Sequence, residues 1–277
     1  MKKLLNVSGK LDVRVVDVYQ AVSGAMARHG LDFLVVGASA RDLVLHYAYG
    51  SPIQRGTIDL DFAIQVGDWD AYQALRATLV AAGYQPTGQS QRLLSPDGMP
   101  VDIVPFGDLA DTDGNITWPP DNNHQMSILG FAEAHADADL VRIQDDPPLE
   151  IPVVSPVGLV LLKLIAWGDR LTGQRAKDAL DVRYVLENYC ELPEERTGLW
   201  RDFDLIELYD GDIELVAAHL LGAGVRALAN EASAAAIDRV LQDRSHELLA
   251  DMSTRLVTRF RRTPNPLDAF MAGYFRR

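Results

Sequence analysis

The spacing of apolar residues near the start of the chain predicts a helix, a strand and a second helix. VRVVDVYQAVSGAMARHG, residues 13–30, carries apolar side chains at helical spacing and ends on Gly30, a residue that favours helix C-termini. DFLVVGA, residues 32–38, is a short β-branched run that predicts a buried strand. SARDLVLHYAY begins with Ser39, a good N-cap, and continues at helical spacing. The order is therefore helix, strand, tight turn, helix.

Two more predicted strands flank a further helix. TIDLDFAIQV, residues 57–66, and PVDIVPFG, residues 100–107, have the composition of strands. DWDAYQALRATLVAAG between them predicts a helix that begins near Asp68 and ends at Gly83, and an SPDGMP turn precedes the last strand. These elements predict an α/β (α+β) unit built on a small mixed sheet.

The rest of the chain changes from polar to helical. The stretch from Asp108 to Pro148 is rich in Asp, Asn and Pro, and we expect loops and edge strands there, with DLVRIQ and LEIPVV as the strand candidates. From SPVGLVLLKLIAWGDR onward the spacing is helical, apart from breaks near CELPEERTG and RTPNP. We therefore expect two closely packed domains, residues 1–152 and a helical domain at residues 153–277.

Composition limits the compartment and the partners. The only cysteine, Cys190, excludes an internal disulfide framework and favours a reducing compartment. The apolar run at the N-terminus is too short for a signal-peptide core, and no uncharged apolar segment has the length of a bilayer crossing, so we expect a cytoplasmic protein without membrane contact. The net charge of -13 repels nucleic-acid phosphates on average. Nucleic-acid binding therefore needs a local basic patch or bound cations.

Three carboxylates form a candidate metal site. Asp59 and Asp61 are two positions apart on a predicted strand, so both side chains point to the same side of the sheet. Two like charges so close call for a cation, and Mg²⁺ prefers hard oxygen ligands while keeping substrate phosphates in its shell. Asp102, between apolar residues of a later strand, is a candidate third ligand that shares the second ion of a pair.

The turn before the second helix is a candidate phosphate site. Gly37, Ala38 and Ser39 open a helix, whose N–H groups and dipole suit phosphates. Gly37 lets the backbone approach closely, and Ser39 adds a hydroxyl. These parts together describe a site for attack on an α-phosphate. Arg41 and Arg55 flank this region, and both a phosphate contact and an ion pair with Asp42 or another carboxylate explain them.

The order of these motifs resembles a known superfamily. A Gly-Ala/Ser-Ser turn, an Asp-apolar-Asp strand and a later strand Asp resemble the nucleotidyltransferases of the DNA polymerase β type. Residues 161–186, LLKLIAWGDRLTGQRAKDALDVRYVL, resemble the pattern K-h-x-A-x-x-x-R and K/R-D-x-x-D-h of AbiEii-like nucleotidyltransferases, toxins of bacterial abortive-infection and toxin–antitoxin systems. The resemblance spans residues 30 to 190. It implies a nucleotidyltransferase domain followed by a helical domain, and Mg²⁺-assisted transfer of a nucleotide from an NTP with release of pyrophosphate.

The resemblance also implies roles for residues of the first domain. The turn Gly37-Ala38-Ser39 matches the phosphate-gripping turn, although Ala38 stands where a second glycine or serine is usual. Asp59 and Asp61 match the metal-binding pair. Asp102 matches a third carboxylate that helps to deprotonate the acceptor hydroxyl.

In the second domain, the resemblance implies that Lys163 reaches the triphosphate and that Asp178 occupies a later acidic site position. A side chain that snorkels from a buried helix is the alternative for Lys163. Arg170, Lys177 and Asp181 belong to the same stretch, and ion pairs between helices explain them equally well.

The acceptor is left open. The C-terminal segment carries six arginines with interleaved aromatic residues, which suits an RNA acceptor, but a solvated helix that pairs with the acidic body explains it too; the arginines are Arg255, Arg259, Arg261, Arg262, Arg276 and Arg277. As a toxin, the protein is expected to have an antitoxin encoded by a neighbouring gene. The alternatives are a small-molecule transferase, whose acidic surface attracts a polycationic acceptor such as an aminoglycoside, and a non-catalytic NTP-binding protein. The complete carboxylate set argues against the last.

Overall fold

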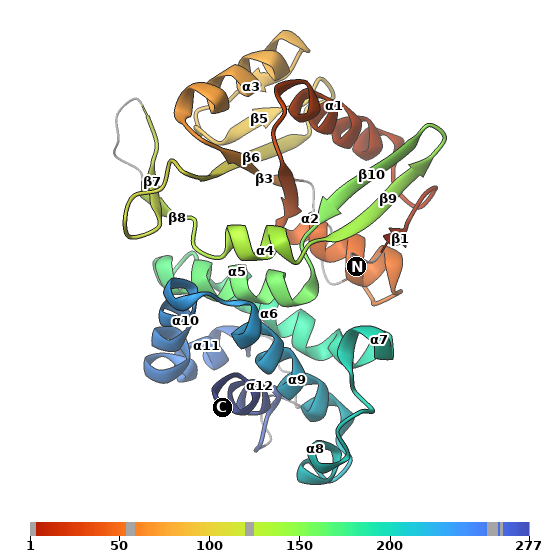
Figure 1. Cartoon of the computed structure of the whole chain (residues 1–277), viewed down its shortest axis with the longest axis vertical. Coiled ribbons are helices and arrows are strands. Elements are labelled where there is room, and N and C mark those ends of the chain that lie inside the picture. Colours follow the sequence, from red (N-terminus) through yellow and green to blue (C-terminus); the bar gives the residue numbers. More distant parts are fainter. Residues whose placement is uncertain (1–3, 54–58, 120–124, 254–259, 261–262, 277) are drawn as a thin grey trace. The chain divides into compact units, whose positions relative to one another are not determined.

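The computed structural model describes residues 4–53, 59–119, 125–253, 260 and 263–276. The chain forms two compact units, Met1–Ser155 and Pro156–Arg277. The first unit combines a mixed sheet with helices, and every regular element described in the second unit is helical (Figure 1). No helix among these described segments is both long and apolar enough to cross a bilayer.

An eight-stranded mixed sheet organises the first unit, in the order β1-β9-β10-β2-β3-β6-β5-β4. Its strands are β1 (Leu4–Asn6), β2 (Phe33–Val36), β3 (Leu60–Val66), β4 (Gln85–Pro86), β5 (Arg92–Leu94), β6 (Pro100–Gly107), β9 (Asp139–Asp145) and β10 (Pro148–Val153). The hairpin of β7 (Asn115–Thr117) and β8 (Gln125–Ser127) forms a second, two-stranded sheet. The strands predicted at residues 32–38, 57–66 and 100–107 are present as β2, β3 and β6. The strand candidates DLVRIQ and LEIPVV are also present, as β9 and β10, whereas the short strands β1, β4 and β5 were not predicted.

The hairpin β9–β10 corrects one expectation. Its two strands were predicted at the edge of the sheet, but β10 pairs in parallel with β2, and β1 pairs in parallel with β9 on the far side. Both strands are therefore interior. Val141, Ile151 and Val153 of these strands are fully buried. The short β1, at the start of the chain, takes the edge position instead.

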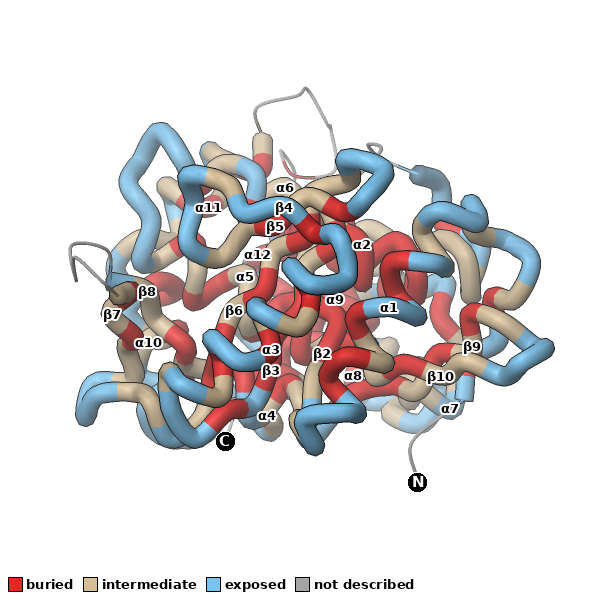
Figure 2. Tube along the Cα trace, turned by 90° about the horizontal axis from the view of Figure 1, so that it is seen from above, coloured by how far each residue is buried: buried red, intermediate tan, exposed pale blue. Residues whose placement is uncertain are grey.

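Helices α1 (Val13–His29) and α3 (Trp69–Ala81) pack against each other beside the sheet. Their ends follow the sequence closely. Gly30 adopts a left-handed conformation with φ 64° after α1, and the Asp68 carboxylate accepts from the backbone N–H of Ala71 at 2.8 Å at the start of α3. The Tyr19 ring of α1 meets the Phe62 ring of β3 edge-on, with ring centroids 5.7 Å apart. The core of this unit lies between these helices and strands, where Figure 2 shows β2 and β3 buried.

The second unit is a bundle of helices. They are α5 (Pro156–Asp169), α6 (Ala176–Asn188), the 3-10 turn η2 (Tyr189–Glu191), α7 (Glu194–Thr197), α8 (Phe203–Leu208), α9 (Ile213–Leu228), α10 (Glu231–Asp243), α11 (Ser245–Met252) and α12 (Pro266–Phe275). Helices α9 and α12 approach very closely, since a Cβ on Gly222 would lie 2.0 Å from the Phe270 carbonyl oxygen. A Cβ on Gly273 would lie 1.9 Å from the carbonyl oxygen of His219. Glycine at both positions permits this packing.

Candidate active site

The three predicted carboxylates lie on one face of the sheet in the first unit. Strands β3 and β6 are parallel, with Asp61 directly opposite Asp102. Asp59 is two residues before Asp61 and shares its side, while Leu60 and Phe62 are buried on the other side. The register of β3 with β6 brings Asp61 beside Asp102, and Asp59, directly before β3, contacts the same Arg92 side chain as Asp102.

The backbone of Gly37 lies directly against this group. Helix α2 (Gly37–Arg41) begins at Gly37, whose φ of +71° belongs to the left-handed region that favours glycine. A Cβ at this position would lie 2.1 Å from the Asp61 Oδ2 atom. Only glycine therefore permits both the turn and the approach of Asp61. The helical path continues from α2 into the wider π-helical turns of η1 (Asp42–Ala48).

Ser39 is not the N-cap of the helix, contrary to the prediction from the sequence. The N-cap of α2 is Val36, because the positive φ of Gly37 turns the chain into the helix before Ser39 is reached. Ser39 is buried within the first turn, and its hydroxyl donates to the Val36 carbonyl oxygen at 3.3 Å. It also hydrogen-bonds the Tyr19 hydroxyl, whose pKa is raised by burial and further raised by the charge of Asp61. Tyr19 thus lies beneath the turn, in contact with a predicted phosphate-binding residue.

Arg92 is part of the site, and it was not among the predicted residues. Its guanidinium donates from Nε to Asp102 Oδ1 at 2.6 Å and from Nη2 to Asp102 Oδ2 at 2.7 Å. The same Nη2 atom lies 3.4 Å from Asp59 Oδ2. The hydrogen bonds to Asp102 raise the pKa of Arg92 above its usual value. A positive group therefore bridges two of the three carboxylates.

The carboxylates have the chemistry of a Mg²⁺ site, since all three offer hard oxygen ligands on one face. The bridging guanidinium shows that this place stabilises positive charge. Among the residues that the structure describes, however, no three Asp, Glu, His or Cys side chains lie close enough together to hold a metal ion as they stand. Asp59, Asp61 and Asp102 could hold an ion after their side chains and that of Arg92 shift.

The two arginines near the turn have different outcomes. The Arg41 side chain is fully buried and donates from Nε and Nη2 to Asp42 Oδ1 at 2.9 and 2.7 Å. The ion pair with Asp42, one of the two interpretations of the sequence, is therefore present, and a contact of Arg41 with a nucleotide stays a prediction. Arg55 lies outside the described residues.

Four charged residues of the helical pattern form one ion-pair cluster within the second unit. Lys163 on α5 donates from Nζ to Asp178 Oδ1 at 3.0 Å and lies 2.8 Å from Asp181 Oδ2, both on α6. Arg170 also pairs with Asp178. The side chains of Asp178 and Asp181 are only 1% exposed, and that of Lys163 is 16% exposed. Burial disfavours the charged ammonium, but attraction by Asp181 and Asp178 outweighs burial and raises the pKa of Lys163. Ion pairs therefore account for Arg170 and Asp181, and the Lys163 ammonium is paired within this unit instead of snorkelling to solvent. Lys177 is exposed on α6 and is not a member of this cluster.

The Gly37 turn, the three carboxylates and the α5–α6 cluster all lie within a stretch that matches a known protein family. Residues 25–271 match the family described as nucleotidyl transferase AbiEii toxin, type IV TA system. The chain belongs to this family. It is therefore an NTP-dependent nucleotidyltransferase of the AbiEii family, and its two units together carry the match.

No curated protein matches this AbiEii nucleotidyltransferase significantly in sequence. Among solved structures, it is similar to ANT(2")-Ia in complex with adenylyl-2"-tobramycin (TM-score 0.37, 11% identity, 75% of this chain and 97% of that chain). It is also similar to an antigenic nucleotidyltransferase-like protein from Paracoccidioides brasiliensis (TM-score 0.41, 14% identity, 86% and 92% covered). A third is CdnG, a CD-NTase of Bradyrhizobium diazoefficiens, in complex with GTP (TM-score 0.31, 18% identity, 96% and 95% covered).

One of the six arginines of the predicted RNA-binding segment, Arg276, belongs to the described residues of this AbiEii protein. Arg255, Arg259, Arg261, Arg262 and Arg277 lie outside the described residues. Arg276 is exposed and directly follows α12. The pKa of His219 is lowered mainly by burial and in addition by the positive charge of Arg276. An RNA contact therefore stays a prediction from the sequence.

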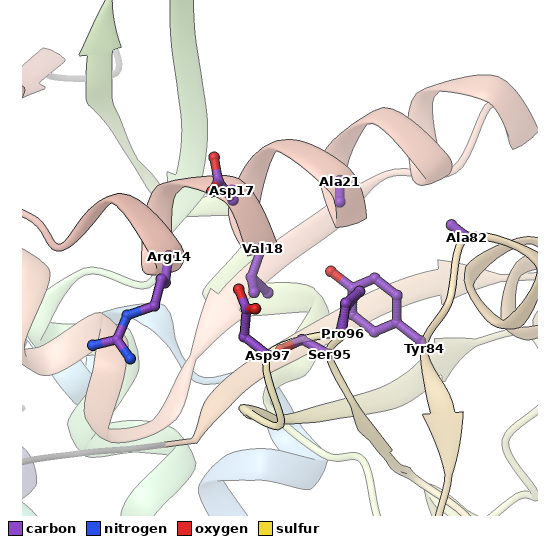
Figure 3. A pocket seen from close by; sticks show the side chains of 9 residues that line it. All are labelled: Arg14, Asp17, Val18, Ala21, Ala82, Tyr84, Ser95, Pro96 and Asp97. Atoms are coloured by element: carbon purple, nitrogen blue, oxygen red, sulfur yellow. The ribbon is translucent and has the colours of Figure 1, made fainter.

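A pocket of ≈ 170 Å³ lies in the first unit, away from the predicted site residues. Helix α1 contributes Arg14 and Val18 on one side, and the turn before β6 contributes Ser95 and Asp97 on the other (Figure 3). Tyr84 forms part of its wall. None of the three carboxylates lines this pocket, so the candidate active site is defined by the sheet face and not by this cavity.

The sequence contained a signal for Arg92 that the motif pattern does not use. The SPDGMP turn joins β5 to β6 as a hairpin, in which Ser95 N donates to Met99 O at 2.8 Å. That turn sets the antiparallel register that pairs Arg92 with Asp102. Counting outward from the turn places an arginine beside the third carboxylate. For Tyr19, by contrast, the sequence predicts only a buried position on a helix and no contact with the site.

Proposed function

We propose that the protein transfers the nucleoside monophosphate of an NTP to an acceptor, RNA in the first instance, with the assistance of Mg²⁺. The single observation that supports this most is the register of Asp61 with Asp102, beside the backbone of Gly37. Carboxylates that suit Mg²⁺, beside a helix start that suits phosphates, are the parts that a metal-dependent transferase requires, and the approach of Asp61 to Gly37 supports this assignment.

In this proposal, Asp59, Asp61 and Asp102 hold two Mg²⁺ ions. When bound, the ions neutralise charge on the triphosphate and activate the attacking hydroxyl. Asp102, the least exposed of the two carboxylates that meet Arg92, accepts the proton of the acceptor hydroxyl. The backbone N–H groups of Gly37, Ala38 and Ser39 bind phosphate oxygens at the start of the helical segment.

Lys163 and Asp178 are the candidates from the second unit. The buried carboxylates of Asp178 and Asp181 already bind the Lys163 ammonium. A triphosphate that uses Lys163 must therefore compete with them or add a further contact to an ammonium that they position. We propose the second, since Lys163 remains 16% exposed and its three donors exceed the two ion pairs.

RNA is the proposed acceptor because the six C-terminal arginines are the main positive segment of an acidic chain. A small polycationic acceptor of the aminoglycoside type is the second candidate, favoured by the net charge of -13. An antitoxin encoded nearby and a role in abortive infection belong to the same proposal, and the match to a type IV toxin family supports them.

One labelling experiment tests the proposal. The protein is incubated with each α-labelled NTP and Mg²⁺, together with total RNA or with an aminoglycoside panel, and Asp61→Asn serves as the inactive control. Label in RNA supports the proposed acceptor, and label only in the drug panel assigns the second one. Absence of label from every acceptor, with all four NTPs, contradicts nucleotidyl transfer by these residues.

A further inference from the structure

The arginine that bridges the carboxylates is anchored where a cation is required. Arg92 belongs to β5, whose backbone pairs with β6 so that Arg92 lies directly opposite Asp102. Its side chain therefore starts on the same face as the three carboxylates. The two bonds to Asp102 and the longer contact with Asp59 place the guanidinium between these two side chains.

Charge explains why the arginine is held there. Asp59, Asp61 and Asp102 bring three negative charges to one face, and Arg92 feels the attraction of all three. A planar guanidinium that binds both oxygens of Asp102 is the arrangement in which an arginine binds a carboxylate most strongly. Arg92 therefore offsets the repulsion that the carboxylates would otherwise exert on one another.

The same bonds occupy the ligands that a metal needs. Both oxygens of Asp102 accept from Arg92, and one oxygen of Asp59 faces it. A divalent ion shared by Asp59 and Asp102 competes with the guanidinium for these oxygens, because side-on binding of either cation to Asp102 uses the same edge of the carboxylate. The side chains are partly exposed, 28% for Arg92, 46% for Asp59 and 14% for Asp102, so water can reach the pair and the bonds can exchange.

We propose that Arg92 is the resident counter-cation of the site and sets its metal affinity, because a divalent ion binds by displacing the guanidinium from Asp102. Arg92 is thus a positioning residue that keeps the carboxylates together before the metal arrives and lowers the affinity for that metal. This inference rests on the proposed function for the assignment of Asp59 and Asp102 as metal ligands.

The test measures metal binding without any substrate. Mn²⁺ is titrated into wild type and Arg92→Gln, and free Mn²⁺ is read by electron paramagnetic resonance. We expect Arg92→Gln to bind Mn²⁺ about ten-fold more tightly, because one partly exposed charged pair no longer competes. Arg92→Lys keeps the charge but loses the two-pronged contact, so its affinity should lie between the two.

Arg142→Gln is the matched control. Arg142 is also on the sheet, is 34% exposed and binds one carboxylate, Glu150, through Nε and Nη2 at 3.0 and 2.6 Å. Its removal changes the net charge equally but leaves the candidate site intact, so Mn²⁺ affinity should not change. An equal gain in Arg142→Gln, or an unchanged or weaker affinity in Arg92→Gln, overturns the proposal.

Two further measurements separate this inference from the proposed function. Asp102→Asn should weaken Mn²⁺ binding in both the wild-type and the Arg92→Gln background, and retention of full affinity would show that Asp102 is not a ligand. Tighter Mn²⁺ binding by Arg92→Gln without any transfer from NTP by wild type would leave the inference standing and remove the proposed function. Circular dichroism and thermal melts of each variant verify folding, and Arg92→Lys provides the test if Arg92→Gln fails to fold.

Discussion

The carboxylate of Asp61 lies against the backbone of Gly37, so closely that a Cβ on residue 37 would be 2.1 Å from Asp61 Oδ2. The turn that starts α2 and the central carboxylate of the candidate site are therefore packed as one unit. This contact joins a residue needed for the fold to a residue proposed for chemistry.

Substitution of Gly37 tests that contact. Gly37→Ala should lower the free energy of unfolding by about 1–3 kcal/mol, because alanine is strained at φ +71° and its Cβ collides with Asp61. It should also abolish transfer. Gly30→Ala is the control, since Gly30 has a similar φ of +64° with nothing within 4 Å of its Cβ. Urea unfolding of both variants separates the destabilisation caused by backbone strain from that caused by the collision with Asp61. Equal losses of unfolding free energy would show that the collision does not destabilise the protein.

Removal of the Asp61 charge tests the chemistry. Asp61→Asn should abolish nucleotidyl transfer while the thermal melting temperature stays close to that of wild type, because the amide has the shape of the carboxylate but not its charge. Asp70→Asn, at an exposed position in the first turn of α3, should retain full activity. Labelled-NTP assays and thermal melts of both variants provide the measurement. Transfer at the wild-type rate by Asp61→Asn would contradict the metal assignment.

The ion pairs of Lys163 change what its removal should do. On the sequence alone, Lys163→Ala is expected to weaken NTP binding with nearly unchanged stability. The structure predicts instead a loss of about 3–5 kcal/mol, because Asp178 and Asp181 are left buried without their ammonium partner. Lys177→Ala, at an exposed position on α6, should cost little. Denaturant unfolding of both variants decides between the two expectations.

The raised pKa of Lys163 also predicts how stability depends on pH. A lysine whose pKa is higher in the folded than in the unfolded chain contributes stability that is fully present below its ordinary pKa of 10.5. That contribution disappears as pH rises through the raised folded value. Lys163→Met should therefore have a smaller fall in unfolding free energy above pH 10.5 than wild type. Urea unfolding of both proteins at pH 9 and at about pH 11 measures how much unfolding free energy each protein loses between the two pH values.

Because α9 and α12 approach closely, substitution of two glycines of α9 should affect stability differently. Gly222→Ala should destabilise by about 2–4 kcal/mol, because its Cβ would lie 2.0 Å from the Phe270 carbonyl oxygen and the helices must separate. Gly224→Ala should be neutral or stabilising, because its nearest neighbour is a Val157 methyl at 3.4 Å and alanine favours a helix. Thermal melts of the two variants suffice, and equal melting temperatures would contradict the packing of α9 on α12.

Growth of cells tests the toxin role and the acceptor together. Expression of wild type should arrest bacterial growth, Asp61→Asn should not, and co-expression of the neighbouring gene should relieve the arrest. If most of the six C-terminal arginines contact phosphates, RNA binding should fall by about 10³-fold or more between 50 and 200 mM salt. A small-molecule acceptor would show a much weaker salt dependence. Equal growth of both strains, with no labelled RNA in either, would contradict the toxin role.

The local features of the site were predictable from the sequence because they depend on neighbouring residues. Asp59 and Asp61 share a face because side chains alternate along any strand. Gly30 and Asp68 end and begin helices through contacts within one turn, and the structure has both caps. Apolar spacing likewise distinguished the mixed α/β unit from the helical one.

Long-range pairing was decided by the tertiary structure alone. The interior place of β9 depends on its parallel pairing with β1, from which it is separated by more than half of the first unit, and that of β10 depends on its parallel pairing with β2. Lys163 meets Asp178 and Asp181 only because α5 and α6 pack together. Arg92 reaches Asp102 through the register of a hairpin. The spacing of residues along the chain determines which side of a helix or strand each residue faces. Its partner on another element depends on how whole elements pack, and this packing is fixed only when the core forms.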